Sequence, residues 1–113
     1  MKHETFIHDN QSYSIFVGGN KHENTKLIED SSSNDVWFHI SGLPSSHVVM
    51  KNTGKLADIP RQVIKRCAYL CKIHTNSAKS IPKCNVIYTT VSNIQTTNIT
   101  GAVITQNTKT VSV

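Results

Sequence analysis

Short runs of apolar and β-branched residues, many of them alternating with polar ones, dominate this chain and predict β-strands. The runs lie at 5–7, 13–17, 36–40, 47–51, 85–91, 102–105 and 110–113. The sequence Gly18-Gly19-Asn20 and the segment 41–46 are turn signals between them. Segment 41–46 is long enough for a wide hairpin between the strands on either side of it.

One segment has helical spacing instead. Asp58 and Pro60 mark its start, and from residue 61 onward positions about 100° apart separate the side chains by polarity. The apolar arc contains Val63, Ile64, Cys67, Leu70 and Cys71. The opposite side carries Arg61, Lys65 and Lys72. With a shorter helix expected over 23–29, the chain predicts an α+β domain: a mostly antiparallel sheet with one long amphipathic helix and a short helix packed on it.

The length of 113 residues, of which 37% are hydrophobic, predicts a single domain over 1–113. No stretch approaches the roughly 20 apolar residues of a membrane span. No apolar segment follows Met1, so we expect no secretory signal and a cytoplasmic protein, with the nucleus as the alternative. Three cysteines without a CxxC pair argue against a disulfide framework.

Charge narrows the class of partner. The chain carries 12 Lys and Arg against 7 Asp and Glu, a formal net charge of +5. An anionic partner is therefore expected: a nucleic acid, an anionic membrane surface or an acidic protein.

The strand at 36–40 has a candidate chemical face, because alternate side chains point to opposite sides of a strand. Asp35, Trp37 and His39 share one side, and His47 opens the next strand. If the two strands pair, Trp37, His39 and His47 form one solvent-exposed surface able to stack bases, donate hydrogen bonds or hold phosphates. The competing interpretation is structural: a packed indole, and histidines bonded to the backbone. The other side is a normal core face of Val36, Phe38 and Ile40.

Two further features have both a ligand-binding and a purely structural interpretation. In residues 18–24, glycines allow close approach of a ligand, Lys21 adds charge, and a helix starting nearby attracts anions; the same residues make an ordinary tight turn. The stripe of Arg61, Lys65 and Lys72 is either a phosphate-contacting surface or the solvated side of a helix.

Catalytic and metal chemistry has weaker support. His39 and His47 as general acid and base, with Asp35 orienting one of them, would make an enzyme acting on RNA or a nucleotide. The same three residues offer ligands to zinc, but their spacing matches no standard motif, so no metal or other cofactor is expected. Cys67 and Cys71 lie on the apolar arc and indicate core packing.

The segment Asp35-Val36-Trp37-Phe38-His39, followed by Ser46-His47, resembles the central signature of the NFACT-R domain. This is the RNA-binding module of NFACT proteins of ribosome-associated quality control, and it also occurs in stand-alone proteins. Gly18-Gly19-Asn20 with Glu23-Asn24 is similar to the glycine loop of that family, and the resemblance extends over 13–113.

The resemblance implies binding of tRNA or ribosome-associated RNA, a link to translation quality control, and DNA as a second partner. By position it implies contacts from Asn20, Lys21, Asn24, Asp35, Trp37, His39, Ser46 and His47; charge adds Arg61, Lys65 and Lys72. Two other classes stay open. One is an adaptor whose Trp37 face docks on ribosomal proteins or another complex, and the other is the enzyme using His39 and His47.

Overall fold

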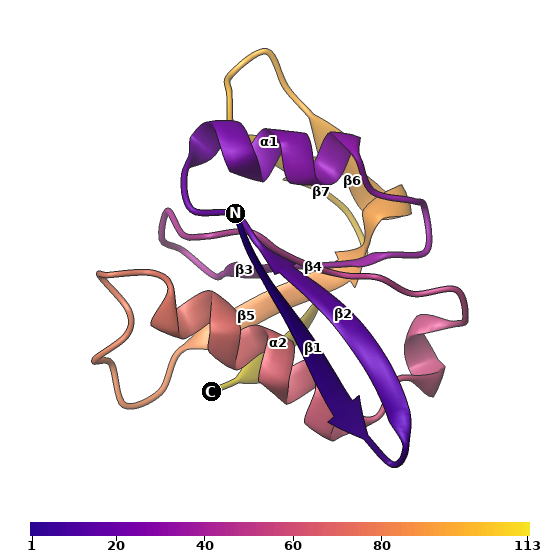
Figure 1. Ribbon diagram of the computed structural model, residues 1–113. Coiled ribbons are helices and arrows are strands. Elements are labelled where there is room, and N and C mark those ends of the chain that lie inside the picture. Colours follow the sequence, from indigo (N-terminus) through magenta and orange to yellow (C-terminus); the bar gives the residue numbers. More distant parts are fainter.

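A six-stranded antiparallel sheet forms the centre of the molecule. In the computed structural model, which describes residues 1–113, its strand order is β1-β2-β4-β3-β5-β8 (Figure 1). The strands are β1 (Lys2–His8), β2 (Gln11–Val17), β3 (Val36–Ile40), β4 (Val48–Met50), β5 (Asn85–Thr90) and β8 (Lys109–Ser112). Every neighbouring pair is antiparallel, so the predicted α+β class with a mostly antiparallel sheet is confirmed.

The first hairpin is longer than its apolar residues predict. β1 and β2 pair from Lys2 opposite Val17 to His8 opposite Gln11. The two residues between them, Asp9 and Asn10, have φ of 49° and 63°. Two successive residues with positive φ match the twist of a tight hairpin, and Asp and Asn tolerate that conformation better than other non-glycine residues. Backbone pairing therefore extends well beyond the predicted strand at 5–7.

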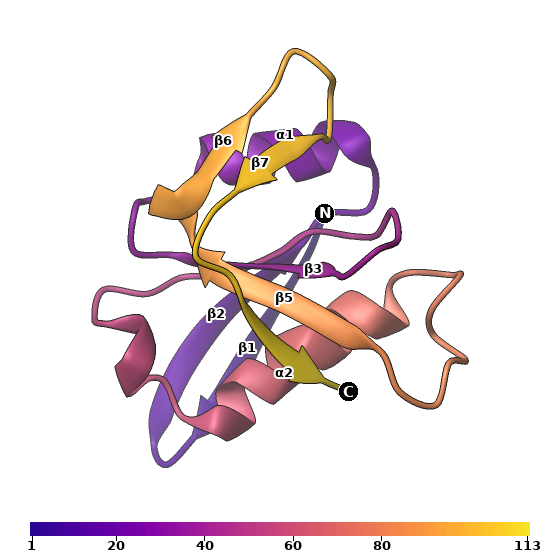
Figure 2. The ribbon, with the colours of Figure 1, turned by 180° about the vertical axis from the view of Figure 1, so that it is seen from behind.

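Different elements cover the two faces of the sheet. Helix α2 (Arg61–Ile73) lies on one face, and helix α1 (Lys21–Glu29) lies on the other beside a small ribbon (Figures 1 and 2). The ribbon consists of β6 (Ile94–Thr96) and β7 (Val103–Thr105), which pair only with each other. Two short 3₁₀ helices, Leu56–Asp58 and Val91–Asn93, precede α2 and β6. The strand at 94–96 is absent from the sequence prediction.

Each face has its own apolar core. On the α2 side, Val36, Phe38 and Ile40 of β3 are almost fully buried against the helix. The helix contributes Val63, Ile64, Cys67, Ala68, Leu70 and Cys71 to this core. On the other side, Leu27 and Ile28 of α1 pack on Trp37 and Val49. The alternation of β3 therefore serves two cores.

The basic side of α2 is smaller than the helical spacing predicts. Arg61 and Lys65 are exposed, but Lys72 is buried. Its Nζ donates a hydrogen bond to the backbone oxygen of Val113 at 3.2 Å. The position of Lys72 around the helix axis was predicted correctly. Its exposure was not, because the C-terminal residues bond to it and its aliphatic stem is buried with the ammonium group held at the edge.

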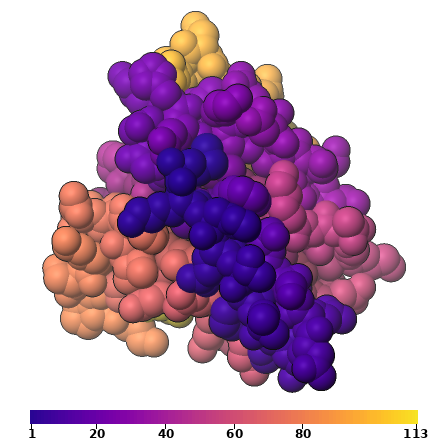
Figure 3. All heavy atoms as spheres, in the orientation of Figure 1, coloured from indigo at the N-terminus to yellow at the C-terminus, as the bar shows by residue number.

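Neither helix combines the length and apolar character needed to cross a membrane. In the space-filling view the β1–β2 hairpin lies across the front of the molecule, with the tip of the segment between β6 and β7 at the top (Figure 3). That segment and the start of α1 meet on the same side of the sheet, where the site described next lies.

Candidate functional site

The rings of Trp37, His39 and His47 gather on the α1 side of the sheet. Trp37 and His39 stack with their ring centroids 5.6 Å apart. His47 meets both rings edge to face, at 5.5 Å from Trp37 and 5.1 Å from His39. β3 and β4 pair as an antiparallel hairpin, as the loop at 41–46 suggested. The prediction that these three rings share one face is correct.

The prediction that this face is open to solvent is wrong for two of the rings. Trp37 is 1% exposed and His47 is 2% exposed, whereas His39 is only partly buried. Leu27 and Ile28 from α1 cover the indole, together with partly buried apolar residues of the ribbon. The indole is therefore a core side chain, available neither for stacking a base nor for contacting a partner protein.

The buried indole fixes the protonation of His47. Trp37 Nε1 donates a hydrogen bond to His47 Nδ1 at 3.1 Å. Because an indole nitrogen only donates, Nδ1 of His47 is an acceptor, and the neutral ring carries its proton on Nε2. Burial, with a smaller contribution from His39, lowers the pKa of His47 to about 3. His47 is therefore neutral at physiological pH.

In His39 the two ring nitrogens have the opposite hydrogen-bonding roles. Its Nδ1 lies 2.6 Å from the backbone oxygen of Ile40, which can only accept, so Nδ1 is the protonated nitrogen. Nε2 of the neutral ring is then an acceptor. Burial lowers the pKa of His39, although the bond to Ile40 opposes this. Two neutral imidazoles, one with a free acceptor and one with a free donor, thus lie side by side.

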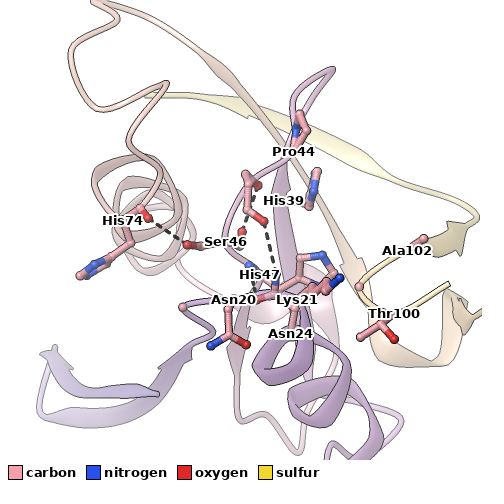
Figure 4. Close-up of a pocket in the computed structure, with 13 residues that line it drawn as sticks. Asn20, Lys21, Asn24, His39, Pro44, Ser46, His47, His74, Thr100 and Ala102 are labelled. Atoms are coloured by element: carbon pink, nitrogen blue, oxygen red, sulfur yellow. Dashed lines mark hydrogen bonds between the residues drawn. The ribbon is translucent and has the colours of Figure 1, made fainter.

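Most of the predicted binding residues line one cleft of about 450 Å³ at the start of α1 (Figure 4). The cleft brings together Asn20, Lys21, Asn24, His39, Ser46 and His47. No aspartate or glutamate contributes to its lining, and most of the lining side chains carry a hydrogen-bonding group. A cleft of this size accommodates a small ligand or part of a larger one.

Asn24 and the glycine loop hold the floor of the cleft in place. The Asn24 side chain is 7% exposed; its Oδ1 accepts a hydrogen bond from the His47 backbone N–H at 3.1 Å. Gly18 N–H donates to the His47 backbone oxygen at 2.9 Å, so both backbone groups of His47 are tied to this region. A Cβ on Gly18 would lie 2.2 Å from Asn24 Oδ1. Glycine is therefore required here for close packing of the loop against α1.

The first turn of α1 supplies donors to the same cleft. Asn20 caps the helix, with its Oδ1 accepting from the Glu23 N–H at 2.9 Å. No side chain accepts from the N–H groups of Lys21 and His22, which have no intrahelical acceptor either. These N–H groups, the helix dipole and the exposed Lys21 ammonium all favour an anion at this end of the cleft.

Other parts of the lining come from residues that were not predicted to bind a ligand. His74 ends α2, and its backbone oxygen accepts from Ser46 Oγ at 3.0 Å. Thr100, Gly101 and Ala102 form the opposite wall. Gly101 has φ of +83°, donates its N–H to Thr25 Oγ1 at 2.7 Å, and is so close to α1 that a Cβ would lie 2.9 Å from Lys21 Cβ. Only Gly101, a residue type that favours turns, marks this wall in the sequence.

Asp35 lies outside the cleft. Its carboxylate accepts from Ser32 N at 2.9 Å, from Asn52 N at 2.9 Å and from Lys51 Nζ at 3.0 Å. Burial opposes ionisation, but these hydrogen bonds outweigh it and lower the pKa of Asp35. The interpretation of Asp35 as the group that orients a catalytic histidine is therefore wrong, since it bonds to neither ring and instead ties together the loops at one end of β3 and β4.

The basic residues of α2 are also separate from the cleft, because α2 covers the other face of the sheet (Figure 1). No group of three or more His, Cys, Asp or Glu side chains is placed to hold a metal ion. Cys67 and Cys71 are buried in the core. Burial raises the pKa of Cys67, and it raises that of Cys71 to about 12, so both are unreactive thiols.

Comparison with known proteins gives a consistent result. The sequence model of the NFACT protein RNA binding domain matches residues 2–110. Coiled-coil domain-containing protein 25 of Bos taurus is 35% identical over 91 residues, which are 79% of this chain and 44% of that protein. Protein JLP2 of Saccharomyces cerevisiae is 36% identical over 88 residues, or 74% of this chain and 42% of that protein. The chain thus spans less than half the length of these curated relatives.

The fold is found in a solved structure as well. The C-terminal part of the fibronectin/fibrinogen-binding protein from Streptococcus suis superimposes with a TM-score of 0.84. The match covers 100% of this chain and 45% of that one at 23% sequence identity, a likeness that concerns the fold alone.

Proposed function

Because this chain belongs to the NFACT RNA-binding domain family, whose general role is RNA binding, we propose that its ligand is tRNA or ribosome-associated RNA and that the α1 cleft is the contact site. The cellular setting that we propose is translation quality control in the cytoplasm. DNA is a second nucleic acid that a basic chain of this kind would bind through its phosphates.

The observation that carries the proposal is the chemistry of the cleft. It has uncapped helix N–H groups, the Lys21 ammonium and no carboxylate in its lining. An anionic backbone meets attraction there, and the nearby Glu23 carboxylate is already bonded to the Gly19 N–H and paired with the Met1 ammonium group. Six residues that the family resemblance implied come from α1 and its capping residue, from β3 and from the β3–β4 connection: Asn20, Lys21, Asn24, His39, Ser46 and His47.

The buried indole changes how the proposed site works. Trp37 acts from beneath the surface, by holding the Nδ1 of His47, instead of stacking on a base. Groups at the surface are Lys21, His39 and the loop backbone. Arg61 and Lys65 lie on the other side of the sheet and would contact only an RNA large enough to wrap around the domain.

The test is a fluorescence-anisotropy titration of labelled tRNA at several salt concentrations. Lys21→Ala should weaken binding about fivefold for every RNA sequence and make the salt dependence shallower by close to one phosphate contact. Lys83→Ala is the matched control, since it removes an equal charge from an exposed loop residue outside the cleft. An equal loss of tRNA affinity in the two variants would mean that binding depends on net charge alone and not on the cleft. No retention of tRNA even at low salt would end the proposal.

A further inference from the structure

The two histidines of the cleft present their free nitrogens with opposite hydrogen-bonding roles. His47 is 2% exposed, and its Nε2–H has no partner within the protein. Every fully enclosed side-chain nitrogen or oxygen in the structure has a partner, so this Nε2 retains access to the cleft that His47 lines. A buried ring whose only unpaired polar atom opens on a cleft is arranged to meet a ligand.

His39 supplies the complementary group. Its Nδ1–H is taken by the oxygen of Ile40, which leaves Nε2 as an acceptor, and its ring centroid lies 5.1 Å from that of His47. The burial that lowers the pKa of both rings keeps them neutral, so neither becomes a general phosphate-binding cation. A donor and an acceptor on two rings in edge-to-face contact suit a group that both accepts and donates, and a hydroxyl is the smallest such group.

The histidine pair also stands at a boundary. It borders the polar cleft at the start of α1 and a second hollow of about 370 Å³ toward the β6–β7 ribbon. Both hollows share His39, His47, Gly101 and Ala102. The second hollow is more apolar, with Ile87 and Val103 in its lining. The Lys21 end of the first hollow suits a phosphate, the histidine pair suits a hydroxyl, and the second hollow suits an apolar ring. This order matches the phosphate, ribose and base of one nucleotide.

We propose that the two hollows hold one unstacked ribonucleotide, whose ribose 2′-hydroxyl accepts a hydrogen bond from His47 Nε2 and donates one to His39 Nε2. Its phosphate lies at the Lys21 end and its base lies in the hollow beside Ile87. This inference rests on the proposed RNA-binding function and goes beyond it, because it makes the histidine pair the element that separates RNA from DNA. A deoxyribose in the same place leaves the donor and the acceptor of the pair unsatisfied, which costs affinity.

The substitutions His39→Asn and His47→Asn test this pair. An asparagine amide occupies about the position of Nδ1, so it can keep the bond to Ile40 or to Trp37 while the ligand-facing Nε2 is lost. Anisotropy titrations use single-stranded RNA and DNA of the same sequence, with thermal unfolding by circular dichroism to confirm that each variant is folded. The wild type should bind the RNA about five- to tenfold more tightly than the DNA. In either variant the preference for RNA should be lost, so that RNA and DNA bind with the same affinity.

Competition with AMP and dAMP identifies the source of the ribonucleotide. Displacement of RNA by AMP, but not by dAMP, supports the same pocket with a free nucleotide as its occupant; no displacement by either, together with the RNA preference, places the nucleotide in a strand. Equal wild-type affinity for RNA and DNA, or a preference that survives both substitutions, overturns the inference and leaves the proposed RNA binding intact. If the wild type binds no RNA at all, both the inference and the proposed RNA-binding function are overturned.

Discussion

Gly18→Ala should destabilise the protein by loosening the contact between the glycine loop and α1. The new methyl group would lie 2.2 Å from Asn24 Oδ1 and 3.2 Å from Asn24 Cα. Asn24 cannot simply turn away, because its Oδ1 is the acceptor for the His47 backbone N–H at 3.1 Å. Crowding a packed site costs about 1–3 kcal/mol, and leaving a buried N–H without an acceptor costs about as much.

Since the two effects are alternatives in part, we expect a loss of about 2–4 kcal/mol in the free energy of unfolding. At about 4 °C per kcal/mol for a domain of this size, the melting temperature should fall by roughly 8–16 °C. Gly54→Ala is the matched control: a Cβ there has nothing within 4 Å, so its effect should stay within about 0.5 kcal/mol. Urea unfolding followed by circular dichroism measures both variants.

A double-mutant cycle isolates the cause. In an Asn24→Ala background the amide oxygen is gone, and most of the cost of Gly18→Ala should disappear, with a coupling energy of about 1 kcal/mol or more. An equal cost of Gly18→Ala in both backgrounds, or a cost no larger than that of Gly54→Ala, would refute the reasoning.

Three other outcomes are expected. Burial lowers the pKa of His47 from 6.5 to about 3, so between these pH values the unfolded chain binds a proton that the folded chain does not. Stability is therefore lost as pH falls through this range, by up to about 1.4 kcal/mol per pH unit. Urea unfolding at a series of pH values measures this loss, and His47→Asn should show a shallower dependence on pH. Trp37→Phe removes the donor to His47 Nδ1 and should cost about 1–3 kcal/mol, with nitrogen-15 NMR showing both imidazole tautomers; an unchanged Nε2–H tautomer would mean that the indole does not set it. Asp35→Asn places amide hydrogens either against Ser32 N–H and the Lys51 ammonium group or against Asn52 N–H, and should also cost about 1–3 kcal/mol. The folded variant should still bind RNA normally, and a loss of tRNA affinity in the anisotropy assay would contradict this.

Local spacing determines what the sequence can predict about the site. The period-two alternation of a strand is set by the backbone itself, so Trp37 and His39 had to share a face once 36–40 formed a strand. Likewise, glycines between a strand and a helix predict that the N-terminal end of the helix is accessible, and the cleft at Lys21 forms there. These inferences depend only on residues that are close together in the sequence.

Exposure depends instead on segments that are distant in the chain. Trp37 is covered by α1 and by a ribbon near residues 94–105, and nothing in 36–40 indicates that either will pack there. Lys72 lies at the predicted angle around its helix, yet the C-terminal residues bury it. His74 and Gly101 reach the cleft for the same reason. Charge and helical position place a side chain on an element, but the packing of layers decides whether a ligand can reach it.

The two walls of the cleft are far apart in the order of synthesis. The glycine loop and α1 are made first, whereas Gly101, whose backbone lies against Lys21, is made some eighty positions later. The nascent chain therefore carries the loop, the helix and both imidazoles well before it has a finished groove, and a product that stops short of Thr100 lacks the opposing wall. Competence to hold a ligand between the two walls is therefore acquired only after Gly101 has been made.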